Sequence, residues 1–246
     1  MARRGPTWNM ERVEWTISMT RIFEDRVEAG RALARSLFTY RAATDAIVLA
    51  LPRGGVPVGF EVARALGLPL DVLVVRKLGL PGQPELAMGA IASGGALVLN
   101  EDVLRFADGC EADLERVRRR EQAELERRER QYRGTRPPLE MAGRTGILVD
   151  DGLATGATME VAVRALRGLG ATRIVVAVPV ASREARDRIA AAADEVVCLE
   201  APMFFSAVGQ WYRDFGQTSD AEVGELLAQS CCGLGADTPG PFPKTS

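Results

Sequence analysis

The chain has 246 residues, of which 47% are hydrophobic and 26% charged, and its formal net charge is −2. These values are typical of a globular protein within the size range of one α/β domain, and they argue against a generally basic nucleic-acid binder. The sequence contains no histidine, which excludes Ser-His-Asp and Cys-His catalysis, histidine-ligated zinc and an imidazole general base.

The two ends of the chain differ from its middle. We expect a flexible extension over residues 1–18, a single domain over residues 19–232 and a flexible Gly- and Pro-rich tail over residues 233–246. The N-terminus has no apolar core of a signal peptide, and no stretch approaches the roughly 18 apolar residues of a membrane span. We therefore expect a cytoplasmic protein. From Met19 onward, apolar residues recur at helical spacing and predict a first helix.

Short apolar runs then alternate with helix-forming segments. The runs are rich in β-branched residues, as strands buried on both faces are, and cover residues 46–51, 71–75, 146–149, 173–178 and 195–199. Helices are predicted at 58–66, 159–169 and 183–193, with Pro57 and Gly170 as start and stop signals. This alternation predicts a parallel sheet that is covered by helices on both sides.

Residues 77–145 interrupt this alternation and are too long for one crossover. Within them, the stretches 87–92 and 96–100 flank Ser93-Gly94-Gly95 and predict a β-hairpin. A helix is predicted from about Glu111 to Tyr132; between Glu111 and Arg133 the sequence has 8 Arg and 7 acidic residues, several of them at i,i+4 spacing. We interpret this helix as a solvated, ion-paired surface rather than a nucleic-acid site.

The most informative segment is residues 147–158, ILVDDGLATGAT. A buried strand ends in Asp150 and Asp151 and is followed by a loop of small residues, after which a helix begins at about Ala157. Small side chains allow backbone N–H groups to approach an anion, and a helix N-terminus adds about half a positive charge. Thr155 and Thr158 can add hydroxyl donors, while two adjacent acids suit ribose hydroxyls, directly or through Mg²⁺. A plain turn with acids that cap the helix is the alternative, and the complete order of these features favours anion binding.

Two further segments offer cations and amides. After the first strand comes Pro52-Arg53-Gly54-Gly55, where a guanidinium and exposed amides suit an anion. Lys77 follows the second predicted strand, where it either meets a leaving phosphate or is simply solvated.

Together these segments resemble the type I phosphoribosyltransferases, and the combination is similar to a bacterial branch known only as predicted phosphoribosyltransferases. The likeness extends from about Met19 to Leu227. It implies a three-layer α/β/α fold with a mostly parallel sheet, one antiparallel strand from an inserted hairpin, and a small hood. The first strand is then expected beside the strand that ends at Asp150.

The resemblance also implies roles for individual residues. The donor would be 5-phosphoribosyl 1-pyrophosphate (PRPP), whose ribose hydroxyls Asp150 and Asp151 would hold, with Mg²⁺ bound to the same acids through water. The 5′-phosphate would lie in the loop formed by Ala154, Thr155, Gly156, Ala157 and Thr158. The pyrophosphate would meet Arg53, Gly54, Gly55 and Lys77, in a loop that in many members contains a non-proline cis peptide.

The implied reaction transfers phosphoribose to a nitrogenous acceptor, for example a nucleobase, and releases pyrophosphate. Arg53, Lys77, Asp150 and Asp151 are the expected catalytic residues, and no covalent nucleophile is needed. Residues 77–95 are the candidate mobile cover, and Glu85 within them is the candidate for proton transfer. Ala154 occupies a position where hypoxanthine-guanine enzymes carry an acid, so that the proton-transfer residue is not assigned by the motif.

Two alternatives stay open from the sequence. The aromatic-rich segment 203–215 either stacks on a base under the hood or packs in the core or against another subunit; dimers are common in the family. The protein is either a transferase or a non-catalytic sensor of PRPP or a nucleotide on the same fold.

Overall fold

The computed structural model describes residues 21–106 and 111–232, so the extension expected at residues 1–18 and the tail expected at 233–246 lie outside the described residues. The centre of the molecule is a five-stranded sheet in which every neighbouring pair of strands is parallel. In spatial order its strands are β2 (Leu70–Val72), β1 (Ala46–Ala50), β6 (Thr145–Val149), β7 (Arg173–Val180) and β8 (Glu195–Glu200). β1 therefore lies beside the strand that ends at Asp150, as expected.

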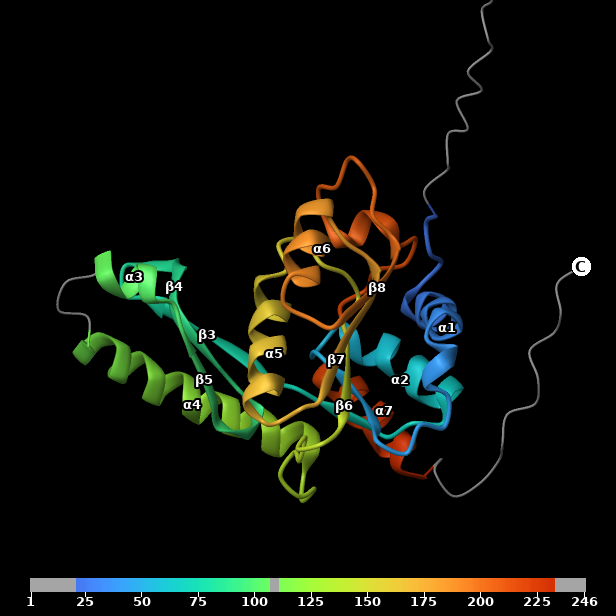
Figure 1. The fold of residues 1–246 in the computed structure, drawn as a ribbon, viewed down its shortest axis with the longest axis horizontal. Helices are drawn as coiled ribbons and strands as arrows, with labels where there is room; N and C mark the ends of the chain where they lie inside the picture. The colour runs from blue at the N-terminus through green and yellow to red at the C-terminus, as the bar shows by residue number, and fades with distance from the viewer. Residues whose placement is uncertain (1–20, 107–110, 233–246) are drawn as a thin grey trace, which may run out of the picture.

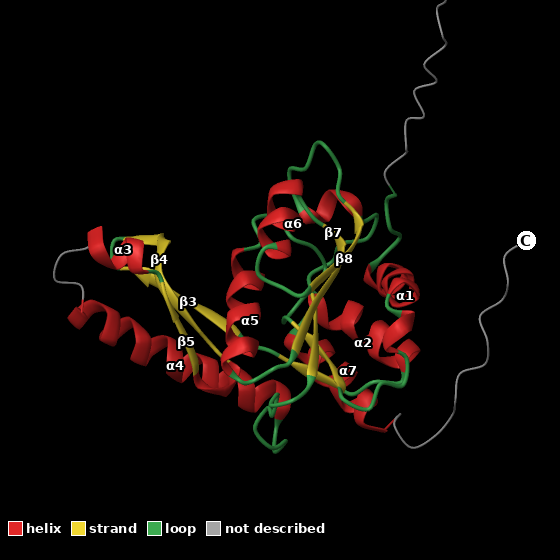
Figure 2. Cartoon of the chain, viewed as in Figure 1, coloured by secondary structure: helices red, strands yellow, loops and turns green. Residues whose placement is uncertain are grey.

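The two faces of this sheet bury alternate residues of each strand. One face carries Val48, Ile147 and Val175 and is covered by α1 (Arg26–Ser36), α2 (Gly55–Leu66) and α7 (Asp220–Cys232). The opposite face is covered by α5 (Ala157–Gly168) and α6 (Arg183–Ala190), which pack on Leu49, Leu148 and Val176. Figure 2 shows these helices on the two sides of the yellow strands. Burial on both faces is the reason that these strands appear in the sequence as continuous apolar runs.

A second layer, which we call the arm, projects from one side of the sheet (Figure 1). It consists of β3 (Val75–Leu80), β4 (Gln83–Ala92), β5 (Ala96–Leu99), α3 (Glu101–Phe106) and α4 (Glu111–Arg133). The three strands form an antiparallel sheet in the order β3-β4-β5, and α4 packs along β3. Leu78, Val117 and Leu125 are part of one hydrophobic core with the first face of the parallel sheet, so the arm is packed on the body rather than tethered to it.

The structure confirms the expected α/β class and corrects it in two details. The hairpin at residues 87–100 is present, but it pairs with β3 in a separate sheet instead of adding an antiparallel strand to the parallel one. The apolar run 71–75 is not one strand: β2 ends at Val72 and β3 begins at Val75. Leu73 N donates to Ala50 O at 3.1 Å, whereas Val74 N donates to Ser93 Oγ at 2.9 Å, so the chain passes from one sheet to the other between these residues.

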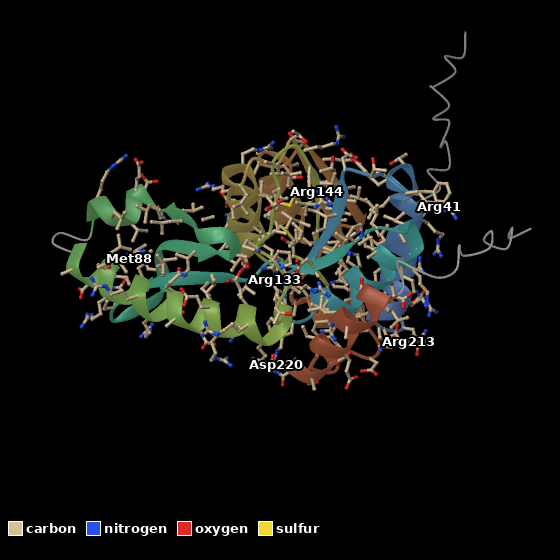
Figure 3. The ribbon with its side chains drawn as sticks, turned by 90° about the horizontal axis from the view of Figure 1, so that it is seen from below. Arg41, Met88, Arg133, Arg144, Arg213 and Asp220 are labelled. Carbon is tan, nitrogen blue, oxygen red and sulfur yellow. The ribbon has the colours of Figure 1, made fainter. Side chains whose placement is uncertain are left out.

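The junction between arm and body also contains polar contacts. Arg133, at the inner end of α4, donates from Nε and Nη2 to both oxygens of Asp71 on β2 at 3.0–3.2 Å. Nη1 of Arg136 lies 3.7 Å from the same carboxylate. Figure 3 shows Arg133 where the arm meets the body, with Met88 farther out along the arm. The side chains of Arg133 and Asp71 are both 10% exposed, which makes this a nearly buried ion pair.

The long helix α4 carries ion pairs along its length, as its sequence indicates. Arg119, Arg128 and Arg130 each pair with a glutamate one turn away, at Glu115, Glu124 and Glu126.

None of the helices in the described ranges is both long and apolar enough to cross a membrane.

Candidate functional site

The loops after β1 and β6 meet at the carboxyl edge of the parallel sheet. Leu51 N donates to Val149 O at 2.9 Å, and the peptide bond between Pro52 and Arg53 is cis. A Cβ atom on Gly54 would lie 2.0 Å from Asp151 Oδ2, and a Cβ on Gly55 would lie 2.7 Å from Val149 O. The glycines are therefore required by the close approach of the two loops. This contact lies between β1 and β6, where the strand order reverses, and such points are where open α/β sheets bind ligands.

Both loops present unpaired backbone N–H groups. Among the described residues, no acceptor lies within hydrogen-bond range of the N–H of Arg53, Gly54, Ala154, Thr155, Gly156 or Thr158. The N-cap residues of α2 and α5 are Gly54 and Gly156, and neither supplies a side-chain cap. Thr155 Oγ1 accepts from Ala157 N only at 3.4 Å. By contrast, α1 and α6 are capped by Asp25 and Ser182. An uncapped helix N-terminus with free amides is a ready site for an anion.

The loop after β6 is held in place by hydrogen bonds to the end of β7 and the N-cap of α6. Leu153 N donates to Val180 O at 3.0 Å, and Ser182 N donates back to Leu153 O at 2.9 Å. The buried hydroxyl of Ser182 also donates to Ala154 O at 2.8 Å. The carbonyls of Leu153 and Ala154 are thus bonded inside the fold, while the described structure gives no acceptor to the N–H groups of residues 154–156; Thr155 and Thr158 are exposed.

The two carboxylates are oriented by bonds to one oxygen each. Asp150 Oδ1 accepts the N–H of Asp151 at 2.9 Å. Asp151 Oδ2 accepts from Nε of Arg26 at 2.9 Å and lies 2.8 Å from Nη2 of the same guanidinium. Within the described ranges no hydrogen bond or ion pair engages Asp150 Oδ2 or Asp151 Oδ1. Each acid therefore keeps one oxygen for a hydroxyl or an ion.

Burial raises the pKa of Asp150 well above its usual value, and the adjacent charge of Asp151 raises it further. Burial also raises the pKa of Asp151, against the opposing effect of Arg26. Two neighbouring carboxylates at low exposure share a proton more readily than exposed ones, so the ligand-free pair does not easily carry two negative charges. Hydroxyl donors or a cation supply the compensation that such a pair needs.

Arg26, Tyr212 and Gly216 are parts of the site that sequence reasoning missed. The Arg26 guanidinium donates from Nη1 to Gly216 O at 2.7 Å and lies 4.0 Å from the centre of the Phe215 ring. The hydroxyl of Tyr212 donates to Asp151 O at 2.5 Å. No local pattern connects Arg26 with an acid 125 positions later; the only available signal was the aromatic composition of the segment 203–215.

The expected pyrophosphate residues are only partly brought together. Gly54 and Gly55 lie against the acids, but the Arg53 guanidinium points to the first residue of α7, with Nη1 3.8 Å from Asp220 Oδ1. Lys77 is exposed on β3 and lines a groove of about 810 Å³ between β3 and α4. In the described parts of the chain, no hydrogen bond or ion pair joins Lys77 to Arg53 or to the acid pair.

The candidate cover belongs to the arm. Residues 77–95 form β3, β4 and the short turn after them, which lie to one side of the parallel sheet (Figure 1). The position of Glu85 in β4 is described, but its side chain is outside the described part of the structure. The cover and the role of Glu85 both stay predictions.

The aromatic-rich segment packs over the loop of the acid pair. A Cβ on Gly152 would lie 2.6 Å from Val208 Cγ1, which places this segment directly on the loop. Tyr212 is buried with Phe23, and Trp211 stacks on Phe205 with ring centres 6.3 Å apart. Phe204 remains 83% exposed. Part of the segment is therefore core packing, while other rings are free to contact a ligand or a partner.

Comparison with known proteins decides the family. The model of the phosphoribosyl transferase domain matches residues 19–214. The chain belongs to this family. The matched range contains both loops, the acid pair and Arg26.

Individual relatives that are about half identical to this chain over the aligned residues support the family assignment. Two curated proteins from strains of Mycobacterium tuberculosis, each named "Putative phosphoribosyl transferase", are 51% identical over 207 residues, which cover 84% of this chain and 46% of each relative. The chain thus spans about half the length of these relatives. The crystal structure of TT1426 from Thermus thermophilus is 48% identical with a TM-score of 0.76, covering 85% of this chain and 98% of that chain.

Proposed function

We propose that this phosphoribosyltransferase-family chain binds PRPP together with Mg²⁺ at the junction of β1 and β6 and transfers phosphoribose to a nitrogenous acceptor. The observation that carries the proposal is the position of the acid pair between two uncapped, amide-bearing loops. The acids suit the two ribose hydroxyls, and the loops suit the anions at the two ends of the donor. The arrangement therefore matches PRPP at three points: its ribose hydroxyls, its 5′-phosphate and its pyrophosphate.

In the proposed reaction, the nitrogen lone pair of the acceptor attacks C1′ of the donor while the bond from C1′ to the pyrophosphate oxygen breaks. The bonding electrons leave with pyrophosphate, and the acceptor nitrogen gives up its proton to solvent. The chain contributes position and charge rather than a nucleophile: the loop 154–158 fixes the 5′-phosphate, and the amides of Arg53 and Gly54 face the negative charge that develops on the leaving group. For Arg53 to do the same with its side chain, its guanidinium must turn away from Asp220.

Mg²⁺ fits this site only as an ion that arrives with its ligand. Among the described residues there is no cluster of three or more acidic, cysteine or histidine side chains that would form a cage for a metal. Asp150 Oδ2 and Asp151 Oδ1 are free, and Mg²⁺ commonly takes one or two carboxylates, retains water and binds substrate oxygens. Asp150 and Asp151 would hold the ion through water, and it would supply positive charge against the charge that develops on the leaving group.

Calorimetry tests the donor site. We expect PRPP with Mg²⁺ to bind the unaltered chain, and the double variant Asp150→Asn/Asp151→Asn to lose most of this affinity because both hydroxyl-binding oxygens change character. Asp187→Asn, at an exposed acid on α6, is the matched control and should bind normally. Unchanged affinity in the double variant would reject the assignment of the acids.

The second candidate function is a sensor that binds PRPP or a nucleotide without catalysis. It is favoured by the two observations that Lys77 and the expected cover are not at the acid pair in this structure. Measurement of pyrophosphate release with a panel of purines, pyrimidines and smaller amines separates the two functions. A transferase releases pyrophosphate with at least one acceptor, whereas a sensor binds the donor and releases none.

A further inference from the structure

The side chain of Arg26 is nearly buried and bonded on every side, unlike that of a typical surface arginine. Arg26 is the first residue of α1, and its side chain is only 12% exposed. All three nitrogens of its guanidinium are engaged: Nε and Nη2 with Asp151 Oδ2, and Nη1 with Gly216 O. The ring of Phe215 covers one face of the group. A side chain so completely constrained is suited to fixing the position of another residue.

The residue that Arg26 fixes is Asp151. Its Oδ2 is held between the guanidinium of Arg26 and the backbone of Gly54, where no Cβ atom fits. Its carbonyl oxygen accepts the hydroxyl of Tyr212. These contacts leave Oδ1 as the oxygen that is free to face a ligand. Without the guanidinium, no hydrogen bond or ion pair in the described structure distinguishes the two carboxylate oxygens of Asp151.

The same guanidinium also joins Asp151 to the segment 212–216, which we call the latch segment. Tyr212, at one end of the latch segment, donates its hydroxyl to Asp151 O. At the other end, Gly216 O accepts from Arg26, which also bonds the carboxylate of Asp151. The planar guanidinium of arginine can bond Asp151 on one side and Gly216 on the other at the same time, whereas the single ammonium group of lysine cannot.

We propose that Arg26 is the positioning residue for the ribose of the donor: it determines which oxygen of Asp151 meets a ribose hydroxyl and links that oxygen to the latch segment. This inference rests on the proposed function. Arg26 makes no described contact with the loop 154–158, so its removal affects recognition of the sugar and leaves recognition of the phosphate intact.

Two probes of different size test this separation, ribose 5-phosphate and inorganic phosphate, each titrated by calorimetry. We expect Arg26→Met to weaken ribose 5-phosphate binding by about 10-fold or more, the effect of losing the charge-assisted hydrogen bond between Asp151 and a ribose hydroxyl, and to change phosphate binding by less than about 2-fold. Arg26→Lys should recover only part of the lost ribose 5-phosphate affinity, because lysine retains the charge but lacks the planar guanidinium that bonds Asp151 and Gly216 together. Tyr212→Phe, which removes the second connection to Asp151, should weaken ribose 5-phosphate in the same selective manner.

Arg31→Met on the same helix is the matched control, since Arg31 is 57% exposed and pairs with Glu61 outside the site. It should leave both affinities unchanged. Equal losses for the two probes in Arg26→Met, or full recovery in Arg26→Lys, would overturn the positioning role. If the unaltered chain binds neither probe, the proposed function itself fails and this inference fails with it; if it binds both and Arg26→Met does too, only the inference fails.

Discussion

At the scale of single residues, the acid pair combines ligand-binding potential with a cost in stability. Asp150 and Asp151 are adjacent, largely buried, and compensated by only one cation, Arg26, among the residues that the structure describes. Such groups resist ionisation because burial removes much of their solvation. Residues arranged for a ligand commonly lower the stability of the empty site.

A substitution that removes this cost gives the first prediction. Asp150→Asn keeps an oxygen that can accept the N–H of Asp151 but removes a buried charge, so the free energy of unfolding at pH 7 should rise by about 1 kcal/mol or more. The measurement is denaturant unfolding in metal-free buffer, with Asp187→Asn as the exposed control. A variant less stable than the unaltered chain at pH 7 would contradict this reading of the pair.

The sign of the pH dependence follows from the direction of the pKa. The folded pKa of Asp150 is raised, so above the ordinary value of about 3.9 the native state binds more protons than the unfolded state does. Its contribution to stability therefore falls as pH rises from about 4 through the raised pKa. We expect the stability advantage of Asp150→Asn to grow over the same pH range, and a difference independent of pH would be the contrary result.

At the scale of elements, four of the described helices differ at their N-termini. α1 and α6 carry side-chain caps, whereas α2 and α5 begin at Gly54 and Gly156 without them. The uncapped pair begins at the two loops that meet at the acids. Glycine at an N-cap costs only about a few tenths of a kcal/mol relative to a side-chain cap, and it allows the amides to face an anion instead.

Gly54→Ala tests the contact between these loops. The backbone of Gly54 is right-handed helical, a conformation that alanine adopts freely, so the effect of the substitution is steric. A Cβ only 2.0 Å from Asp151 Oδ2 must displace the carboxylate, and we expect donor affinity to fall by about 10-fold or more and stability by about 1–3 kcal/mol. Calorimetry and denaturant unfolding measure the two effects.

Gly168→Ala is the control for this prediction. Gly168 is the last residue of α5 and has no atom within 4 Å of a Cβ among the described residues. Alanine there should leave donor binding unchanged and raise stability slightly, by up to about 1 kcal/mol. Equal effects of the two substitutions would show that the loops do not meet as described.

At the scale of the whole molecule, the arm depends on a small polar junction as well as on shared apolar packing. Asp71 on β2 is bonded by Arg133, which also donates to Pro137 O at 2.6 Å. Because both partners of the ion pair are nearly buried, loss of one leaves the other charge inadequately solvated.

We therefore expect Arg133→Met to lower the free energy of unfolding by about 3 kcal/mol, the lower part of the range for broken buried pairs, because Arg136 still lies near Asp71. Arg130→Met, on the exposed side of the same helix, should change it by less than about 0.5 kcal/mol. Denaturant unfolding measures both, and amide hydrogen exchange in β3 and β4 shows whether the arm opens before the body. Similar effects in the two variants would refute a structural role for the junction.

Much of this molecule was predictable from local sequence. Apolar runs identified the five parallel strands, and the glycine-rich turn at residues 93–95 identified the hairpin of the arm. The motif ILVDDGLATGAT and the PRGG loop identified the two segments that meet at the site. These features are readable because each depends on residues that are neighbours in the chain: burial on both faces, a helix start, a tight turn.

Only the tertiary structure assigned Arg26, Tyr212 and Gly216 to the acid pair, separated the run 71–75 into two strands, and turned Arg53 toward Asp220. The physical reason is the same in each case. A hydrogen bond or ion pair between residues far apart in the chain leaves no periodicity in the sequence, because its geometry is created by the packing of whole elements. The chain encodes locally which segments carry amides and carboxylates, and the fold decides which cation holds them.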